Sequence, residues 1–78
     1  MNVSALVLTL SPDHRSRDRA IDRLRADRRL TLGPRVLDRL PVVAETTSDA
    51  SGEDLVRELA TVDGVVKVDV VAVELEGR

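Results

Sequence analysis

The sequence predicts one α+β domain in which two helices cover a single face of a four-stranded antiparallel sheet. Residues 51–74 combine a capped amphipathic helix, a glycine and a valine-rich strand. Residues 3–10 are mostly apolar on both faces of a strand, which is typical of a central strand. Two short apolar runs, residues 30–36 and 40–46, stand between the two helices. Together these patterns give the order β, α, β, β, α, β.

The first helix is expected directly after the strand of residues 3–10. Ser11 can cap it with its hydroxyl and Pro12 suits the first helical position, so we expect a helix that runs to about Arg28. Its inward-facing stripe consists of Ala20, Ile21 and Leu24. Because this stripe is narrow and the charged face is broad, the helix should lie on the sheet with most of its surface in water.

The two runs between the helices are expected to form a hairpin. Gly33 and Pro34 interrupt residues 30–36, and proline cannot donate a hydrogen bond to a ladder, so this run should be an edge strand. Pro41 lies near the start of residues 40–46, where a missing N–H is tolerated.

Residues 51–74 predict the second helix and the last strand. Ser51 is the expected cap, Asp54 stands three residues later as a capping box requires, and Gly64 can take a left-handed conformation after the helix. The apolar residues at helical spacing are Leu55, Val56, Leu59 and Val62. The strand residues expected to face the helices are Val66, Val68, Val70 and Ala72, and those expected to face away are Lys67, Asp69 and Val71.

With right-handed crossovers and both helices on one face, this order gives the ferredoxin-like βαββαβ sandwich with strand order 4-1-3-2. The chain of 78 residues is expected to form one such domain, residues 1–78. Because both helices lie on one side, the other face of the sheet should be open to solvent or to a partner.

The composition argues against enzymatic chemistry. The chain has no cysteine and a single histidine, His14, so it offers no thiolate and too few imidazoles for a histidine-built metal site. Ser11 and Ser51 are expected as helix caps, and neither has a histidine base to activate it. No phosphate-cradling glycine loop is present. We therefore expect no enzyme activity, no cofactor and no metal.

Charge is distributed unevenly along the chain. Residues 13–29 hold seven arginines and four aspartates, whereas residues 45–78 hold nine acidic and three basic residues. Clustered arginines can neutralise phosphates. The aspartates, however, are spaced for ion pairs on the helix surface, at Arg15/Asp18, Asp22/Arg25 and Arg23/Asp27. A solvated helix face is the favoured interpretation, and no nucleic-acid partner is expected.

No apolar run approaches the length of a membrane span. Residues 3–10 are also too short for a secretory signal, and lack its preceding basic segment and cleavage site. We expect a cytoplasmic protein without a membrane partner.

Several stretches resemble a known family. Residues 3–8, the helix that starts at Ser11, residues 40–45 and, above all, residues 62–71 look like the corresponding parts of the NapD-like family. Members of this family are small cytoplasmic assembly chaperones of the periplasmic nitrate reductase. The resemblance implies a non-enzymatic function: binding the twin-arginine signal peptide of a molybdenum enzyme precursor and delaying its export until the cofactor is loaded.

The resemblance also implies that the peptide binds as a helix against the open sheet face. Strand alternation assigns Ala5, Val7, Thr9, Val43, Glu45, Lys67, Asp69 and Val71 to that face. This apolar strip flanked by acids suits a guest with an apolar helix face and two arginines, and we infer that Glu45 or Asp69 accepts a guanidinium. The alternative is a small regulatory or oligomerisation domain that forms a homodimer through the sheet face.

Overall fold

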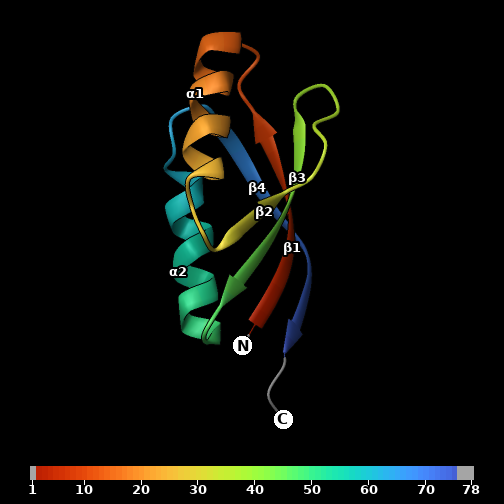
Figure 1. The fold of residues 1–78 in the computed structure, drawn as a ribbon, viewed down its shortest axis with the longest axis vertical. Coiled ribbons are helices and arrows are strands. Elements are labelled where there is room, and N and C mark those ends of the chain that lie inside the picture. Colours follow the sequence, from red (N-terminus) through yellow and green to blue (C-terminus); the bar gives the residue numbers. More distant parts are fainter. Residues whose placement is uncertain (1, 76–78) are drawn as a thin grey trace.

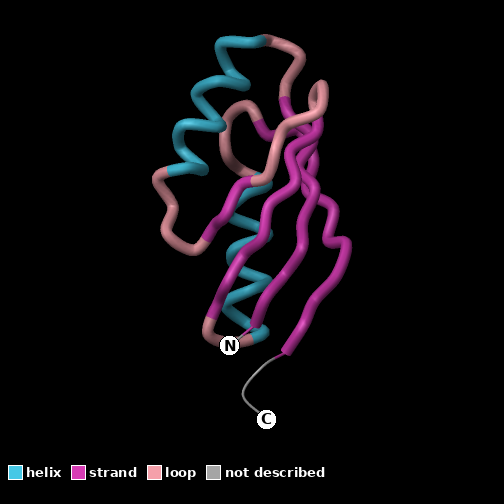
Figure 2. Tube along the Cα trace, turned by 45° about the vertical axis from the view of Figure 1, so that its right-hand side comes forward, coloured by secondary structure: helices cyan, strands magenta, loops and turns pink. Residues whose placement is uncertain are grey.

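The computed structural model describes residues 2–75 and shows the predicted order of elements (Figure 1). The elements are β1 (Asn2–Leu10), α1 (His14–Arg25), β2 (Leu30–Leu32), β3 (Arg39–Thr46), α2 (Asp49–Ala60) and β4 (Val65–Leu75). All strand pairs are antiparallel, in the order β2-β3-β1-β4, which is the predicted order 4-1-3-2 counted from the other edge. Both helices lie on one side of the twisted sheet (Figure 2). The ferredoxin-like sandwich is therefore confirmed.

The core lies between this helix layer and the inner face of the sheet. It consists of Leu6, Leu8, Leu10, Ala20, Leu24, Leu30, Leu40, Val42, Ala44, Leu55, Leu59, Val62 and Val65. Alternate residues of β1 and β3 are buried, so period-two alternation predicts their faces correctly. At the end of the sheet where β1 begins, the Asn2 amide donates a hydrogen bond of 2.6 Å to the Asp49 carboxylate and ties β1 to the start of α2.

Helix α1 starts later and ends earlier than predicted. Its N-cap is Asp13, whose carboxylate accepts a 3.1 Å hydrogen bond from the Ser16 N–H. The hydroxyl of Ser11, the predicted cap, instead accepts from the Asp13 N–H and stabilises the turn before the helix. The helix ends at Arg25 rather than near Arg28 because the chain tightens into turns that lead to β2. Of the predicted stripe, Ala20 and Leu24 are buried and Ile21 packs against the core.

Helix α2 is also capped by a different residue from the predicted Ser51. Ser48 is the N-cap, and its hydroxyl accepts a 3.1 Å hydrogen bond from the Ser51 N–H. Ser51 therefore lies inside the first turn. At the other end, Thr61 is the C-cap, and its hydroxyl donates to the Glu58 carbonyl. Gly64 has a φ of 95°, so its predicted left-handed conformation is confirmed.

The hairpin of β2 and β3 is strongly asymmetric. Strand β2 is an edge strand of three residues that stops before Gly33 and Pro34, in agreement with the effect predicted for the proline. The Pro41 carbonyl accepts a hydrogen bond from the Gly33 N–H just beyond the end of β2. The chain reverses at a tight turn in which Leu37 has a φ of 56°.

Strand β4 departs from simple alternation at two bulges. Leu10 and Thr9 pair with Val65 and Lys67, which leaves Val66 as an extra residue. The second bulge lies at Val71, because Leu6 pairs with Val70 and Ala5 with Ala72. Val66 and Ala72 were predicted to face the helices, and both predictions are wrong. Val65 is buried in place of Val66, and Ala72 lies opposite Ala5 on the outer face.

Candidate functional site

The outer face of the sheet is the side that no helix covers among residues 2–75 (Figure 2). Three strands form its centre, and their register brings residues together in rows across the sheet. In the middle rows the residues of β1 and β3 are apolar: Val43 pairs with Ala5, and Pro41 pairs with Val7. We call this surface the open face. It is built by the strict alternation of β1 and β3 and by the bulged strand β4.

The open face holds all the residues that the sequence assigned to it. They are Ala5, Val7, Thr9, Val43, Glu45, Lys67, Asp69 and Val71. Their register gives an apolar centre on β1 and β3, bordered by charged residues on β4 and at one end of β3. Lys67 lies opposite Thr9 near one end, Asp69 lies beside Val7, and Glu45 lies beside Val3 near the other end.

A shallow apolar groove with a volume of about 280 Å³ lies at the centre of the open face. Its lining residues are Ala5, Leu6, Val7, Thr31, Leu32, Gly33, Pro41, Val42, Val43 and Val71. Val43 and Val71 remain 42% and 64% exposed, so both side chains are available to a ligand. Covering the exposed part of one such valine contributes about 1 kcal/mol, so the groove is a suitable site for an apolar side chain of a partner.

The two acids predicted to accept a guanidinium are placed differently. Asp69 lies 3.4 Å from the Lys67 ammonium, so its charge is already partly compensated. Glu45 is exposed, and no ion pair that the structure forms within residues 2–75 involves it. Of the two, Glu45 is the better acceptor for an incoming cation.

A third acid, Glu74, belongs to the same end of the open face and was missed from the sequence. Val3 pairs with Glu45 on one side and with Glu74 on the other, so two exposed carboxylates flank one valine. Strict alternation would have turned Glu74 toward the helices. The bulge at Val71 reverses this direction, and a valine-rich strand carries no local signal that locates such a bulge.

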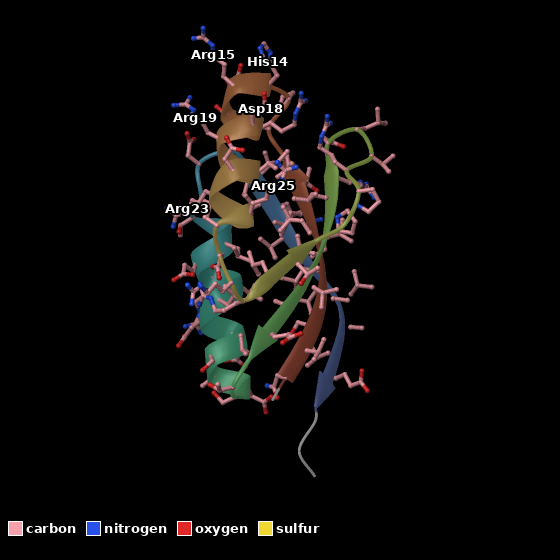
Figure 3. The ribbon with its side chains drawn as sticks, in the orientation of Figure 1. His14, Arg15, Asp18, Arg19, Arg23 and Arg25 are labelled. Carbon is pink, nitrogen blue, oxygen red and sulfur yellow. The ribbon has the colours of Figure 1, made fainter. Side chains whose placement is uncertain are left out.

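The arginines of α1 lie on the helix layer, away from the open face. The labelled side chains of Arg15, Arg19 and Arg23 project from the side of α1 that faces away from the strands (Figure 3). None of the three predicted ion pairs forms within the described part of the chain. Asp27 pairs with Arg29 instead of Arg23. His14 is exposed in the first turn of the helix.

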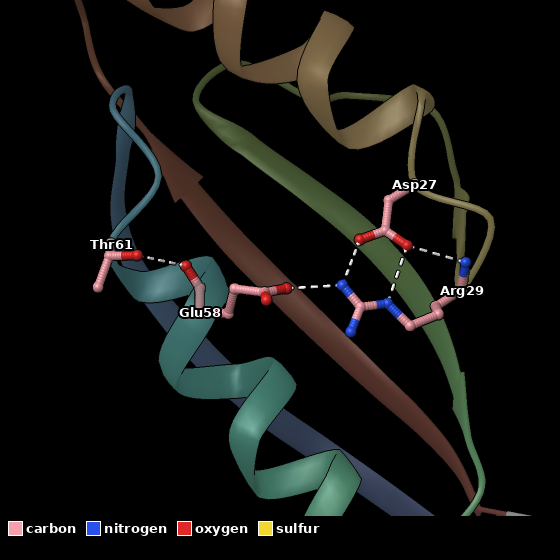
Figure 4. Close-up of polar contacts among 4 residues, drawn as sticks. All are labelled: Asp27, Arg29, Glu58 and Thr61. Atoms are coloured by element: carbon pink, nitrogen blue, oxygen red, sulfur yellow. Dashed lines mark hydrogen bonds and ion pairs between the residues drawn. The ribbon is translucent and has the colours of Figure 1, made fainter.

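The strongest ion-pair cluster links the two halves of the helix layer. The Arg29 guanidinium donates to both oxygens of Asp27, at 3.0 and 2.7 Å, and to Glu58 of α2 at 2.6 Å (Figure 4). The hydrogen bonds from Arg29 hold the pKa of Asp27 below its usual value. This cluster fixes the turn between α1 and β2 against α2, and its position away from the open face indicates a structural role.

Residues 2–75 contain neither a metal-binding cluster nor a membrane-spanning helix. This part of the chain contains no group of three or more His, Cys, Asp or Glu side chains placed to hold a metal ion. No helix in it is both long and apolar enough to span a membrane. Comparisons of the chain with protein-family models, with curated proteins and with solved structures found no match.

Proposed function

We propose that this chain is a non-enzymatic cytoplasmic chaperone of the NapD-like type. It binds the twin-arginine signal peptide of a molybdenum oxidoreductase precursor on the open face and delays export until the cofactor is loaded. The resemblance of residues 62–71 and of the other matching stretches to that family supports this proposal. The observation that carries it furthest is the apolar groove on a helix-free face with two carboxylates at one end.

The chemistry of the guest fits this arrangement. A signal peptide of this class joins an arginine pair to an apolar segment, and a helical guest presents its apolar side chains on one face. We infer that an apolar side chain enters the groove beside Val43 while an arginine donates to Glu45. Glu45 takes this role rather than Asp69, because Lys67 already accompanies Asp69.

Calorimetric titration with the twin-arginine leader of a molybdenum oxidoreductase tests the proposal. Binding heat is expected, together with NMR shifts at Val7, Val43 and Val71. Replacing Val43 by lysine should weaken binding by at least about tenfold, since it places a charge in the apolar groove. Absence of both heat and shifts would exclude the proposal.

A double-mutant cycle isolates the contact between Glu45 and the arginine pair. Glu45→Gln should weaken binding of the leader by about three- to tenfold, because the lost contact is a solvent-exposed charge-assisted hydrogen bond. The same variant should have no effect on a leader in which both arginines are glutamine. Glu53→Gln is the matched control, since Glu53 is an exposed acid on α2. Equal effects of Glu45→Gln on both leaders would remove Glu45 from the contact.

Light scattering separates this proposal from the alternative of a domain that dimerises through the sheet face. A stable dimer that Val43→Lys dissociates would favour the alternative, because it would place the partner subunit over the groove. If no such dimer forms at working concentrations, the open face is free and the peptide-binding proposal is favoured.

A further inference from the structure

Within the described part of the chain, strand β4 leaves one long edge of the sheet without a partner. It has eleven residues and, among residues 2–75, pairs with β1 alone. The opposite edge, β2, has only three residues. A long edge strand presents a row of backbone N–H and C=O groups that can pair with another strand.

The side chains of β4 are also poorly covered. Val66 and Val70 are 65% and 50% exposed, although Val70 lies opposite the buried Leu6 on the side of the helices. Val70 and Val73 line a groove of about 450 Å³ with Val56 of α2. Helix α2 packs against β4 but leaves part of the strand uncovered, so apolar surface remains at this edge.

The sequence along this edge is complementary to itself. Residues 66–70 read Val-Lys-Val-Asp-Val and are symmetric about Val68 except for the opposite charges. If Val68 of two antiparallel copies meets on a twofold axis, Lys67 of each copy stands opposite Asp69 of the other. Lys67 and Asp69 both lie on the open-face side, as cross-strand partners must.

We propose that two copies of this chain associate through antiparallel pairing of their β4 strands about Val68, so that their sheets become continuous. Two cross-strand ion pairs between Lys67 and Asp69 fix the register, and Val68 of one copy meets Val68 of the other. The ion pair of 3.4 Å within each strand shows that the two charged groups already project side by side. This dimer does not bury the groove of the open face.

The two bulges of β4 limit the length of the segment that can pair and therefore the affinity of the dimer. They lie at Val66 and Val71, so the regular pairing segment between them is short. A short interface of this kind is expected to be reversible, with a dissociation constant on the order of 10–100 µM.

Charge reversal tests the register. In the proposed register, position 67 of one copy faces position 69 of the other. Lys67→Asp therefore places two acids opposite each other, and Asp69→Lys places two bases opposite each other. Each single variant should weaken the dimer by at least about tenfold. An equimolar mixture of the two variants should form a heterodimer with the affinity of the original protein. The double variant K67D/D69K should form a homodimer again, since it exchanges the two charges. Sedimentation velocity over a range of concentrations measures all four species.

Both positions are exposed, so the variants should keep their fold, which far-UV circular dichroism checks. Val43→Lys is the control, because it changes the open face and should leave the edge dimer intact. A protein that stays monomeric up to about 1 mM would overturn the proposal, as would a dimer insensitive to both charge reversals. A dimer lost in Val43→Lys would also overturn it. None of these results involves the signal peptide, so the proposed function would stand or fall separately.

Discussion

Replacing Gly64 by alanine should destabilise the protein more than an ordinary surface substitution does. Gly64 has a φ of 95°, a conformation that costs a residue with a side chain about 1–2 kcal/mol. An added Cβ would also lie 2.3 Å from the backbone oxygen of Ser16 and 2.9 Å from the Ala20 Cβ. Relieving that contact requires α1 to move away from the turn before β4. Adding about 1–2 kcal/mol for this displacement gives a total loss of roughly 2–4 kcal/mol.

The free energy of unfolding can be measured by urea titration with far-UV circular dichroism, since the chain has no tryptophan or tyrosine for fluorescence. For a domain of this size, a loss of 2–4 kcal/mol corresponds to a fall in melting temperature of roughly 10–30 °C.

Gly52→Ala is the matched control. Gly52 lies inside α2, and an added Cβ there meets only the Thr46 hydroxyl at 3.3 Å. This control should be neutral or stabilising by up to about 1 kcal/mol. If Gly64→Ala unfolds within about 0.5 kcal/mol of the original protein, the close approach to Ser16 is refuted.

Other predictions concern the polar cluster and the hairpin turn. Arg29→Ala should reduce the free energy of unfolding by about 0.5–1 kcal/mol, since the side chains of the cluster are partly exposed, and urea titration at pH 7 measures it. The pKa of Asp27 is lowered in the folded state, so its contribution is present above the pKa of the unfolded chain and is lost as the pH falls through the folded value. The difference between Arg29→Ala and the original protein should therefore shrink below about pH 4, and an undiminished difference at pH 2.5 would contradict this assignment. Leu37→Gly should stabilise the fold by about 0.5–1 kcal/mol, because Leu37 is exposed with a positive φ, and a lower melting temperature would contradict it.

The parts of the fold that were predictable are those in which one local rule operates without competition. In β1 and β3, period-two alternation continues without a bulge between the two strands, so the faces of Leu8, Val42 and Val43 follow directly from their positions. In α2, the apolar spacing identifies Leu55 and Leu59 as core residues. These regular patterns also determine the order of the elements and therefore the topology.

The caps could not be predicted because several neighbouring residues can perform the same task. Ser11 and Asp13 each have a side-chain oxygen that can accept from the chain ahead, and both do so, but only Asp13 begins the helix. Ser48 and Ser51 present the same ambiguity before α2. Which residue becomes the N-cap depends on where the preceding strand ends. The end of the strand is set by tertiary contacts, which local propensity does not contain.

The bulge at Val71 has the largest consequence for the candidate site, because it brings Glu74 to the open face. Under the proposed function, Glu74 and Glu45 flank Val3 and both attract the arginine pair of the leader. Glu74→Gln should therefore weaken binding of the twin-arginine leader by about three- to tenfold, and have no effect on the glutamine leader. Strict alternation without a bulge would place Glu74 on the side of the helices, where the substitution would leave the affinity for both leaders unchanged. Calorimetry with the two leaders thus distinguishes the bulged strand from the regular one, provided that Glu45→Gln shows the expected coupling in the same experiment.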